Sequence, residues 1–209
     1  MEKLRSVFFP FEKACTRLYE CFLGIDTITL PSGRLGVETQ FDDRVHYEPV
    51  EYRLIPRLLR PLQMAPSDVV FDVGCGLGRF LCVIGRMPVR KCVGIEITPQ
   101  LASSARLNAE KLRFRKAPIE VRTEDAALAD YDEGTIFILS NPFGAKTMEV
   151  VLDRIEKSFS DSPRNIRLAY ATPVHEDVFR NRDSLVRYES VSFRSSRLKV
   201  SYWTFKACR

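Results

Sequence analysis

The stretch VVFDVGCGLGRF, residues 69–80, is the most informative part of this sequence. An apolar run, Val69–Val73, favours a buried strand, and a helical pattern begins after the turn that follows it. Three glycines stand at alternate positions in that turn: Gly74, Gly76 and Gly78. Glycine lets a backbone bend sharply and lie close to a bound molecule. The dinucleotide spacing GxGxxG would need a glycine where this chain has Arg79, so the pattern here is GxGxG.

Short runs rich in strand-forming residues alternate with helical patterns from this stretch onward, as in βα units that build a parallel sheet covered on both faces. The predicted strands of this kind are Val69–Val73, Lys91–Ile97, Ile119–Thr123, Thr135–Ser140 and Ile166–Ala171. The predicted helices between and after them are Arg79–Arg86, Pro99–Arg115, Met148–Phe159 and His175–Asn181. Two further helices are predicted upstream, Phe11–Phe22 and Pro49–Leu62.

The C-terminal end departs from this alternation. Two strand-forming runs, Leu185–Phe193 and Leu198–Phe205, are separated only by residues 194–197. Such a short link permits a hairpin and leaves no room for a crossover helix. Five parallel strands closed by an antiparallel hairpin resemble the Rossmann-like, seven-stranded sheet of class I methyltransferases, an α/β fold with helices on both faces.

The glycine turn resembles motif I of methyltransferases that use S-adenosylmethionine (SAM). The resemblance places Asp72 and the backbone of Gly74, Cys75, Gly76 and Gly78 against the methionine part of SAM. The chemistry agrees, because SAM carries an ammonium and a sulfonium, both of which favour nearby carboxylates.

Two acids follow the next two predicted strands in the expected order. Glu96 ends the second strand, where an acid accepts hydrogen bonds from ribose hydroxyls. Asp125 follows the third strand, and by the resemblance it accepts a hydrogen bond from the adenine amino group, with Glu124 as a second choice. SAM is therefore the predicted cofactor.

The fourth predicted strand ends in FILSNPFG, residues 137–144. Asn141, Pro142 and Phe143 resemble the Asn/Asp-Pro-Pro-Tyr/Phe motif of enzymes that methylate nitrogen, although the second proline is absent here. The Asn141 side-chain oxygen can accept a hydrogen bond from an NH group and hold the nitrogen lone pair toward the methyl group. Phe143 can stack on a planar substrate or exclude water. These three residues are the predicted catalytic group.

The segment LGVETQFDDRVHYEPVEY, residues 35–52, extends the resemblance to a group of bacterial class I methyltransferases with a YEP element before motif I. By that resemblance Tyr47 and Glu48 close over SAM or meet the substrate, and Tyr47 joins the cofactor-binding set. A helical N-terminal extension or lid is predicted for residues 1–46, and the SAM-binding domain for residues 47–209. The candidates for a general base are Glu48, Glu51 and His175.

The amino-acid composition indicates the general class of protein. The chain has 209 residues, of which 45% are hydrophobic and 28% charged, as in an ordinary folded domain. No stretch of 18 uncharged apolar residues occurs, which predicts no membrane association. Six cysteines without a CxxC pair, and two distant histidines, favour a reduced cytoplasm and no metal site.

The net charge of +5 is concentrated in residues 180–209, where eight basic and two acidic residues leave +6. This segment is either a solvated basic edge or a surface for an acidic partner. The predicted function is therefore SAM-dependent methyl transfer to a nitrogen of a small molecule or protein side chain. The alternatives are a nucleic-acid methyltransferase that uses the basic segment and a non-catalytic SAM-binding regulatory module. A third alternative, an NAD-dependent oxidoreductase, is opposed by Arg79 and by the C-terminal hairpin. The oligomeric state is not predicted.

Overall fold

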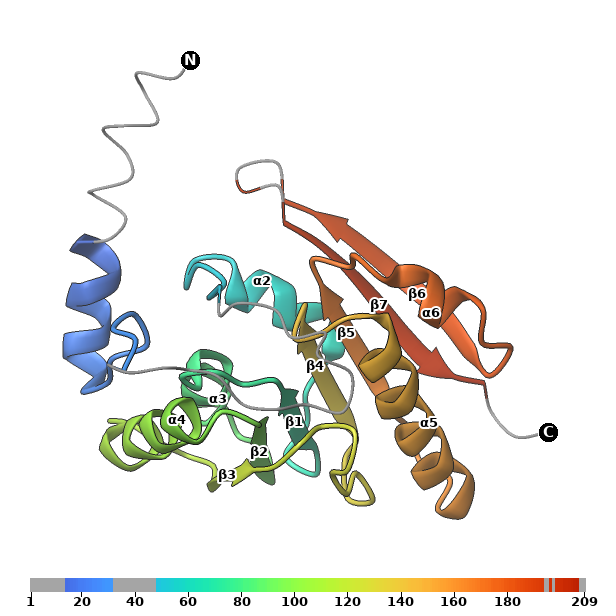
Figure 1. Cartoon of the computed structure of the whole chain (residues 1–209). Helices are drawn as coiled ribbons and strands as arrows, with labels where there is room; N and C mark the ends of the chain where they lie inside the picture. Colours follow the sequence, from blue (N-terminus) through green and yellow to red (C-terminus); the bar gives the residue numbers. More distant parts are fainter. Residues whose placement is uncertain (1–13, 32–47, 194–195, 197, 207–209) are drawn as a thin grey trace.

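A computed structural model describes residues 14–31, 48–193, 196 and 198–206. Its centre is one seven-stranded sheet with the strand order β3-β2-β1-β4-β5-β7-β6 (Figure 1). The strands are β1 (Val69–Val73), β2 (Lys91–Glu96), β3 (Ile119–Thr123), β4 (Ile136–Ser140), β5 (Arg167–Ala171), β6 (Leu185–Ser192) and β7 (Lys199–Phe205). The predicted fold class is confirmed.

The first five strands pair in parallel, and β7 pairs antiparallel with both β5 and β6. The register shifts between Arg187 and Glu189, which marks a bulge in β6. The order of the sheet reverses at β1, since β2 lies on one side of it and β4 on the other. In open α/β sheets, the crevice outside the carboxyl ends of the strands at such a reversal is where ligands bind.

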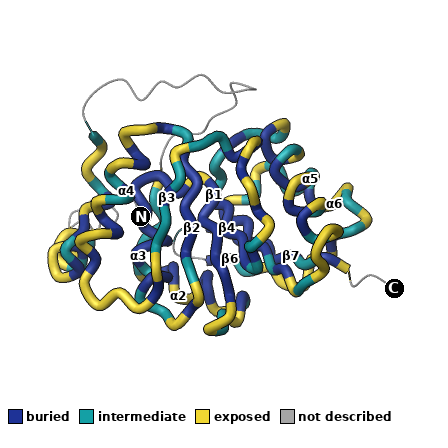
Figure 2. The backbone as a smooth tube through the Cα atoms, turned by 90° about the horizontal axis from the view of Figure 1, so that it is seen from below, coloured by how far each residue is buried: buried dark blue, intermediate teal, exposed yellow. Residues whose placement is uncertain are grey.

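Alternate residues of the central strands enter two separate hydrophobic clusters, one on each face of the sheet. Val70 and Ile138 pack with the helices α2 (Ile55–Leu59), α3 (Arg79–Ile84) and α4 (Pro99–Lys111). Phe71 and Phe137 pack on the other face with α5 (Ala145–Asp161) and α6 (Glu176–Arg180). Strands buried on both faces have continuous apolar runs, and Figure 2 shows these strands as the buried centre of the molecule.

The predicted helix over 49–62 was too long. Helix α2 begins at Ile55, and the 3₁₀ turn η1 (Arg60–Leu62) follows it directly. Proline occupies the first turn of both elements, as Pro56 and Pro61. Because proline lacks a backbone N–H, it is accommodated at a helix start. Residues 48–54 remain a non-helical segment that leads into α2. Within the described part of the chain, none of the helices has the length and apolar character needed to cross a membrane.

The described part of the predicted extension packs against the domain. Residues 14–23 are helical, and the first three residues of the helix predicted over 11–22 lie outside the described residues. Leu23 and Ile25 are buried in a small cluster with Cys82 of α3 and Leu112, which follows α4. The Asn108 side chain of α4 also accepts a hydrogen bond from the Asp26 amide at 2.8 Å. Residues 14–31 therefore lie against α3 and α4.

Candidate functional site

A pocket lies at the carboxyl ends of β1, β2 and β4, at the reversal of the strand order. The predicted residues that line it are Asp72, Gly74, Cys75, Gly76, Glu96, Asp125, Asn141, Pro142 and Phe143. They come from the ends of the first four strands and from the loops that follow them, and the parallel alignment of the strands brings them together. Arg79, Phe80, Thr98, Leu101 and Thr147 also line the pocket and were not predicted.

The glycine turn has the left-handed backbone that glycine favours, with φ values of 78° at Gly74, 55° at Gly76 and 79° at Gly78. A Cβ on Gly74 would lie 2.4 Å from the Cβ of Pro142, so the β1–α3 and β4–α5 loops are in direct contact there. A Cβ on Gly78 would lie 3.2 Å from that of Ala105 in α4. Gly78 does not line the pocket, and α4 packs where a side chain at position 78 would lie. Close packing is therefore a further reason for glycine at positions 74 and 78, in addition to the predicted approach to a ligand.

Glu96 holds the glycine turn in place. One of its oxygens, Oε2, accepts a hydrogen bond from the Gly76 amide at 2.9 Å, and Oε1 accepts one from the Thr98 amide at 2.8 Å. The side chain is buried at the pocket wall. Each carboxylate oxygen can accept a second hydrogen bond, so Glu96 retains the capacity to bind hydroxyl groups that enter the pocket.

Asp72 is the most deeply buried acid of the pocket. Its side chain is 2% exposed, and its Oδ2 atom has no hydrogen-bond partner among the described residues. Burial, and secondly the negative charge of Glu96, raise the pKa of Asp72 to about 8. Two nearby carboxylates in a buried pocket favour a positively charged ligand, which would lower this pKa again. These two carboxylates fit the ammonium and sulfonium of the predicted cofactor.

Glu124 and Asp125 both line the pocket beyond the end of β3. The Asp125 Oδ1 atom accepts a hydrogen bond from the Ala127 amide at 2.8 Å and so shapes its own turn. Burial raises the pKa of Glu124, and its Oε1 atom has no partner among the described residues. Glu124, the second choice from the sequence, is thus as well placed as Asp125 to meet a ligand.

Asn141 has a left-handed backbone with φ of 45°, which turns the chain sharply at the end of β4. Its Oδ1 atom is buried and has no hydrogen-bond partner among the described residues. An acceptor atom left without a donor costs free energy unless a ligand satisfies it. Phe143 lies at the pocket edge, and most of its ring is buried in the hydrophobic cluster of α5.

A second pocket adjoins the first. The two share the lining residues Glu48, Pro49, Val50, Ser140 and Asn141. Glu51, Leu54, Thr172, Ser196 and Leu198 complete the lining of the second pocket. Asn141 therefore stands where the two pockets meet, and no basic residue is among the described residues that line the second one.

The remaining predicted residues differ in their placement. Tyr47 lies outside the described residues. Glu48 lines both pockets, whereas Glu51 lines only the second and forms a 2.5 Å ion pair with Arg53. His175 precedes α6 and lines neither pocket.

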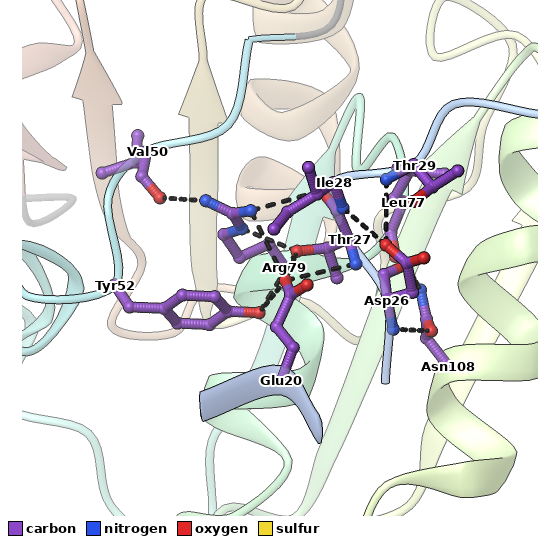
Figure 3. A network of polar contacts seen from close by, with 10 residues as sticks. All are labelled: Glu20, Asp26, Thr27, Ile28, Thr29, Val50, Tyr52, Leu77, Arg79 and Asn108. Atoms are coloured by element: carbon purple, nitrogen blue, oxygen red, sulfur yellow. Dashed lines mark hydrogen bonds and ion pairs between the residues drawn. The ribbon is translucent and has the colours of Figure 1, made fainter. Parts of the chain in front are cut away.

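Arg79 is the centre of a buried polar network (Figure 3). Its Nε donates to Thr27 Oγ1 at 2.7 Å, its Nη1 to the Val50 carbonyl at 3.0 Å, and its Nη2 to the Thr27 carbonyl at 3.3 Å. The Nη2 atom is also 3.5 Å from Glu20 Oε1. The guanidinium lies 4.5 Å from the centre of the Tyr52 ring, a cation–π contact. The sequence showed only that this position is not the glycine of a dinucleotide site.

The basic C-terminal segment is partly neutralised. Arg180 and Arg187 pair with Glu176, and Arg182 pairs with Asp153 and Glu156. Arg194, Arg197 and Arg209 lie outside the described residues.

Comparisons with known proteins agree with this geometry. Residues 71–139, which run from β1 to β4, match the family model described as a methyltransferase domain. A protein-lysine N-methyltransferase of Saccharolobus islandicus is 26% identical over 123 residues, which cover 57% of this chain and 73% of that protein. A ribosomal protein L11 methyltransferase of Cupriavidus necator is 34% identical over 79 residues, 38% of this chain but only 26% of that protein. The fold is similar to that of an RNA methyltransferase of Salinibacter ruber solved with S-adenosyl-L-homocysteine, with a TM-score of 0.57, 22% identity, and coverage of 78% of this chain and 96% of that one.

Proposed function

We propose that this chain, a SAM-dependent methyltransferase with the class I fold, transfers its methyl group to a nitrogen atom of a protein side chain. The observation that carries the proposal concerns the buried Oδ1 atom of Asn141 at the junction of the two pockets, which has no hydrogen-bond partner among the described residues. An amide oxygen accepts hydrogen bonds and donates none, so the group that it binds must carry an N–H or O–H.

The pocket with Asp72 and Glu96 is the cofactor side of this junction, and the second pocket is the acceptor side. Glu48 and Glu51 line the acceptor side together with the neutral residues Ser140 and Thr172. Carboxylates favour a cationic acceptor such as an amine over an anionic one. A nitrogen acceptor therefore suits this lining better than a phosphate-bearing substrate does.

When bound, SAM supplies a methyl group on a positively charged sulfur. Asp72, Glu96 and the amides of the glycine turn would hold it, and Asn141 would orient the acceptor nitrogen so that its lone pair faces the methyl carbon. An ammonium must lose a proton before it can react, and Glu48, which lines both pockets, is the residue best placed to accept it. Orientation of this kind accounts for much of the rate enhancement in transfers between two bound molecules.

The curated relatives support a protein acceptor, since one modifies protein lysine and the others modify a ribosomal protein. The chain matches about a quarter of the length of the ribosomal protein L11 methyltransferases, so their substrate recognition is not carried over. A small-molecule amine remains the second candidate from the sequence. A cytoplasmic location is part of the proposal, on the basis of the free, buried thiols of Cys75, Cys82 and Cys92.

The experiment that tests the proposal uses SAM labelled in its methyl group and a cell extract separated into protein, nucleic-acid and small-molecule fractions. We expect label in protein, on a residue that mass spectrometry identifies as lysine or another nitrogen-bearing side chain. Label in the nucleic-acid fraction would instead support the alternative in which the basic segment 180–209 binds RNA or DNA, and binding there should weaken steeply with salt.

One control variant makes the result specific. The variant Asn141→Ala should bind SAM but transfer little label, which separates enzymatic labelling from background. If SAM binding is confirmed and no fraction gains label, the result would favour the non-catalytic SAM-binding module.

A further inference from the structure

Acidic residues outnumber basic residues among the described residues that line the cofactor pocket. Five are acids: Glu48, Asp72, Glu96, Glu124 and Asp125. Arg79 is the sole basic residue among the described residues of this lining. The acids match the two positive charges of SAM, whereas Arg79 would repel them. Its presence in the pocket therefore needs a separate explanation.

The contacts of Arg79 leave one donor available. A guanidinium has five N–H groups. Thr27 Oγ1, the Thr27 carbonyl, Glu20 and the Val50 carbonyl accept from four of them. The second N–H of Nη1 has no acceptor among the described residues. Arg79 is only 6% exposed and lines the pocket, so its contacts hold this remaining N–H in a fixed direction.

SAM has one negatively charged group, the carboxylate of its methionine part. We propose that Arg79 binds this carboxylate, an inference that rests on the proposed function. The one basic residue among the described residues of the lining then pairs with the one anionic group of the cofactor, and the acids pair with the cofactor's ammonium and sulfonium. Arg79 also distinguishes SAM from adenosine compounds that lack a carboxylate.

Residues 14–31 belong to the cofactor site on this view, because they hold Arg79 in place. Glu20 balances the buried guanidinium charge and accepts a hydrogen bond from the Tyr52 hydroxyl at 2.8 Å. Thr27 contributes two acceptors to the same guanidinium, and the Thr27 hydroxyl donates to Glu20. The Val50 carbonyl connects the network to the segment that lines both pockets. A donor fixed by so many contacts loses little freedom when a ligand binds.

The test compares the dissociation constants of SAM and decarboxylated SAM, which keeps the ammonium, sulfonium and adenosine but lacks the carboxylate. We expect the wild-type protein to bind SAM about tenfold to a hundredfold more tightly than the decarboxylated compound, as for the loss of a hydrogen bond to a charged group. In Arg79→Met the two constants should become similar, because only SAM binding weakens. Equal affinities in the wild type, or an unchanged ratio in Arg79→Met, would overturn the proposal.

A second variant guards against misfolding, since Arg79→Met leaves the Glu20 carboxylate buried without its partner. The double variant Glu20→Gln/Arg79→Met removes both charges together, which proteins tolerate far better than the loss of one partner. The double variant should also bind SAM and decarboxylated SAM with similar affinity. A ratio of dissociation constants equal to that of the wild type would refute the role of Arg79.

The matched control is Arg86→Met. Arg86 also connects this region to the N-terminal segment, through a 2.8 Å hydrogen bond to the Tyr19 hydroxyl, but it does not line the pocket. In Arg86→Met, the ratio of the dissociation constants of the two compounds should equal that of the wild type. Failure of the wild-type protein to bind either compound would refute the proposed function itself, whereas tight but equal binding of both would refute only the role of Arg79.

Discussion

Gly74 and Pro142 lie in direct contact, although 68 positions separate them in the sequence. A Cβ at position 74 would come within 2.4 Å of the Pro142 Cβ. The parallel pairing of β1 with β4 sets this contact, because Val73 is in register with Leu139 and the two loops start side by side. The glycine turn and the turn that carries Asn141 are therefore fixed against each other. In the proposed function, this contact would set the direction from which an acceptor nitrogen meets the methyl group.

The variant Gly74→Ala should reduce methyl transfer more than its loss of stability would account for. The new Cβ would displace Pro142 and, with it, Asn141, and the left-handed backbone adds about 1–2 kcal/mol of strain. Gly78→Ala is the matched variant, with nearly the same φ but with Ala105 as its neighbour. Turnover and melting temperature should be measured for both. Equal turnover at equal stability would show that the Gly74–Pro142 contact does not position Asn141.

Gly76→Val should abolish SAM binding while most of the fold remains. At φ of 55° a β-branched side chain is strongly disfavoured, and it would disturb the amide that Glu96 holds. Binding measured by calorimetry, together with the melting temperature, tests this expectation. A folded variant with wild-type affinity would remove the turn from the cofactor site.

The affinity for SAM should increase as the pH rises toward 8. Burial and Glu96 raise the pKa of Asp72 to about 8, so the empty protein holds Asp72 protonated below that pH. The cation binds the ionised form, so binding must release the proton, and the affinity falls about tenfold for each pH unit below the raised pKa. Calorimetry in buffers of different ionisation enthalpy would measure the released proton.

Asp72 also affects the stability of the empty protein, and this stability should change with pH in the opposite direction to the affinity for SAM. The folded state binds this proton up to about pH 8, whereas the unfolded carboxyl releases it near its ordinary value of 3.8. The free energy of unfolding should therefore fall as the pH rises between these two values. The variant Asp72→Asn should lose both this contribution and the proton release. A wild-type pH profile in that variant would show that another group is responsible.

Asn141→Ala should reduce kcat far more than the affinity for SAM. The variant removes the acceptor atom that would orient the substrate nitrogen, while the acids and glycines of the cofactor pocket stay in place. Single-turnover rates and SAM dissociation constants, measured on the same preparation, test this. Equal losses in both would exclude Asn141 from the acceptor site.

Asp68→Ala should destabilise the protein without changing the affinity for SAM. Asp68 lies before β1, at the amino end of the strand, and is 4% exposed; its Oδ1 atom is 2.6 Å from Arg167 Nη2. Removal of one partner of a buried ion pair costs about 3–5 kcal/mol. For a chain of this length we expect the melting temperature to fall by roughly 6–20 °C. A changed SAM affinity would show that the effect reaches the opposite end of the strand.

The strands and the residues that follow them could be predicted because they depend on local patterns. Each of the central apolar runs became a strand within one residue of its predicted bounds, since a strand buried on both faces must be apolar throughout. Asp72, Glu96 and Asn141 came together as predicted, because parallel strands end at the same edge of a sheet. The helix over 49–62 was predicted too long, since leucine spacing does not reveal that new elements begin just before Pro56 and Pro61.

The sequence by itself determined the fold class and the loop that carries Asn141, and it predicted the cofactor, because periodicity and turn chemistry are local properties. Only the tertiary structure placed Pro142 against Gly74 and Glu20 beside Arg79, since these pairs are 68 and 59 positions apart in the chain. It also raised the pKa of Asp72, because desolvation depends on what surrounds a carboxyl group in three dimensions. The arrangement of charges in the pocket is therefore a product of packing between segments whose sequences give no sign of their contact.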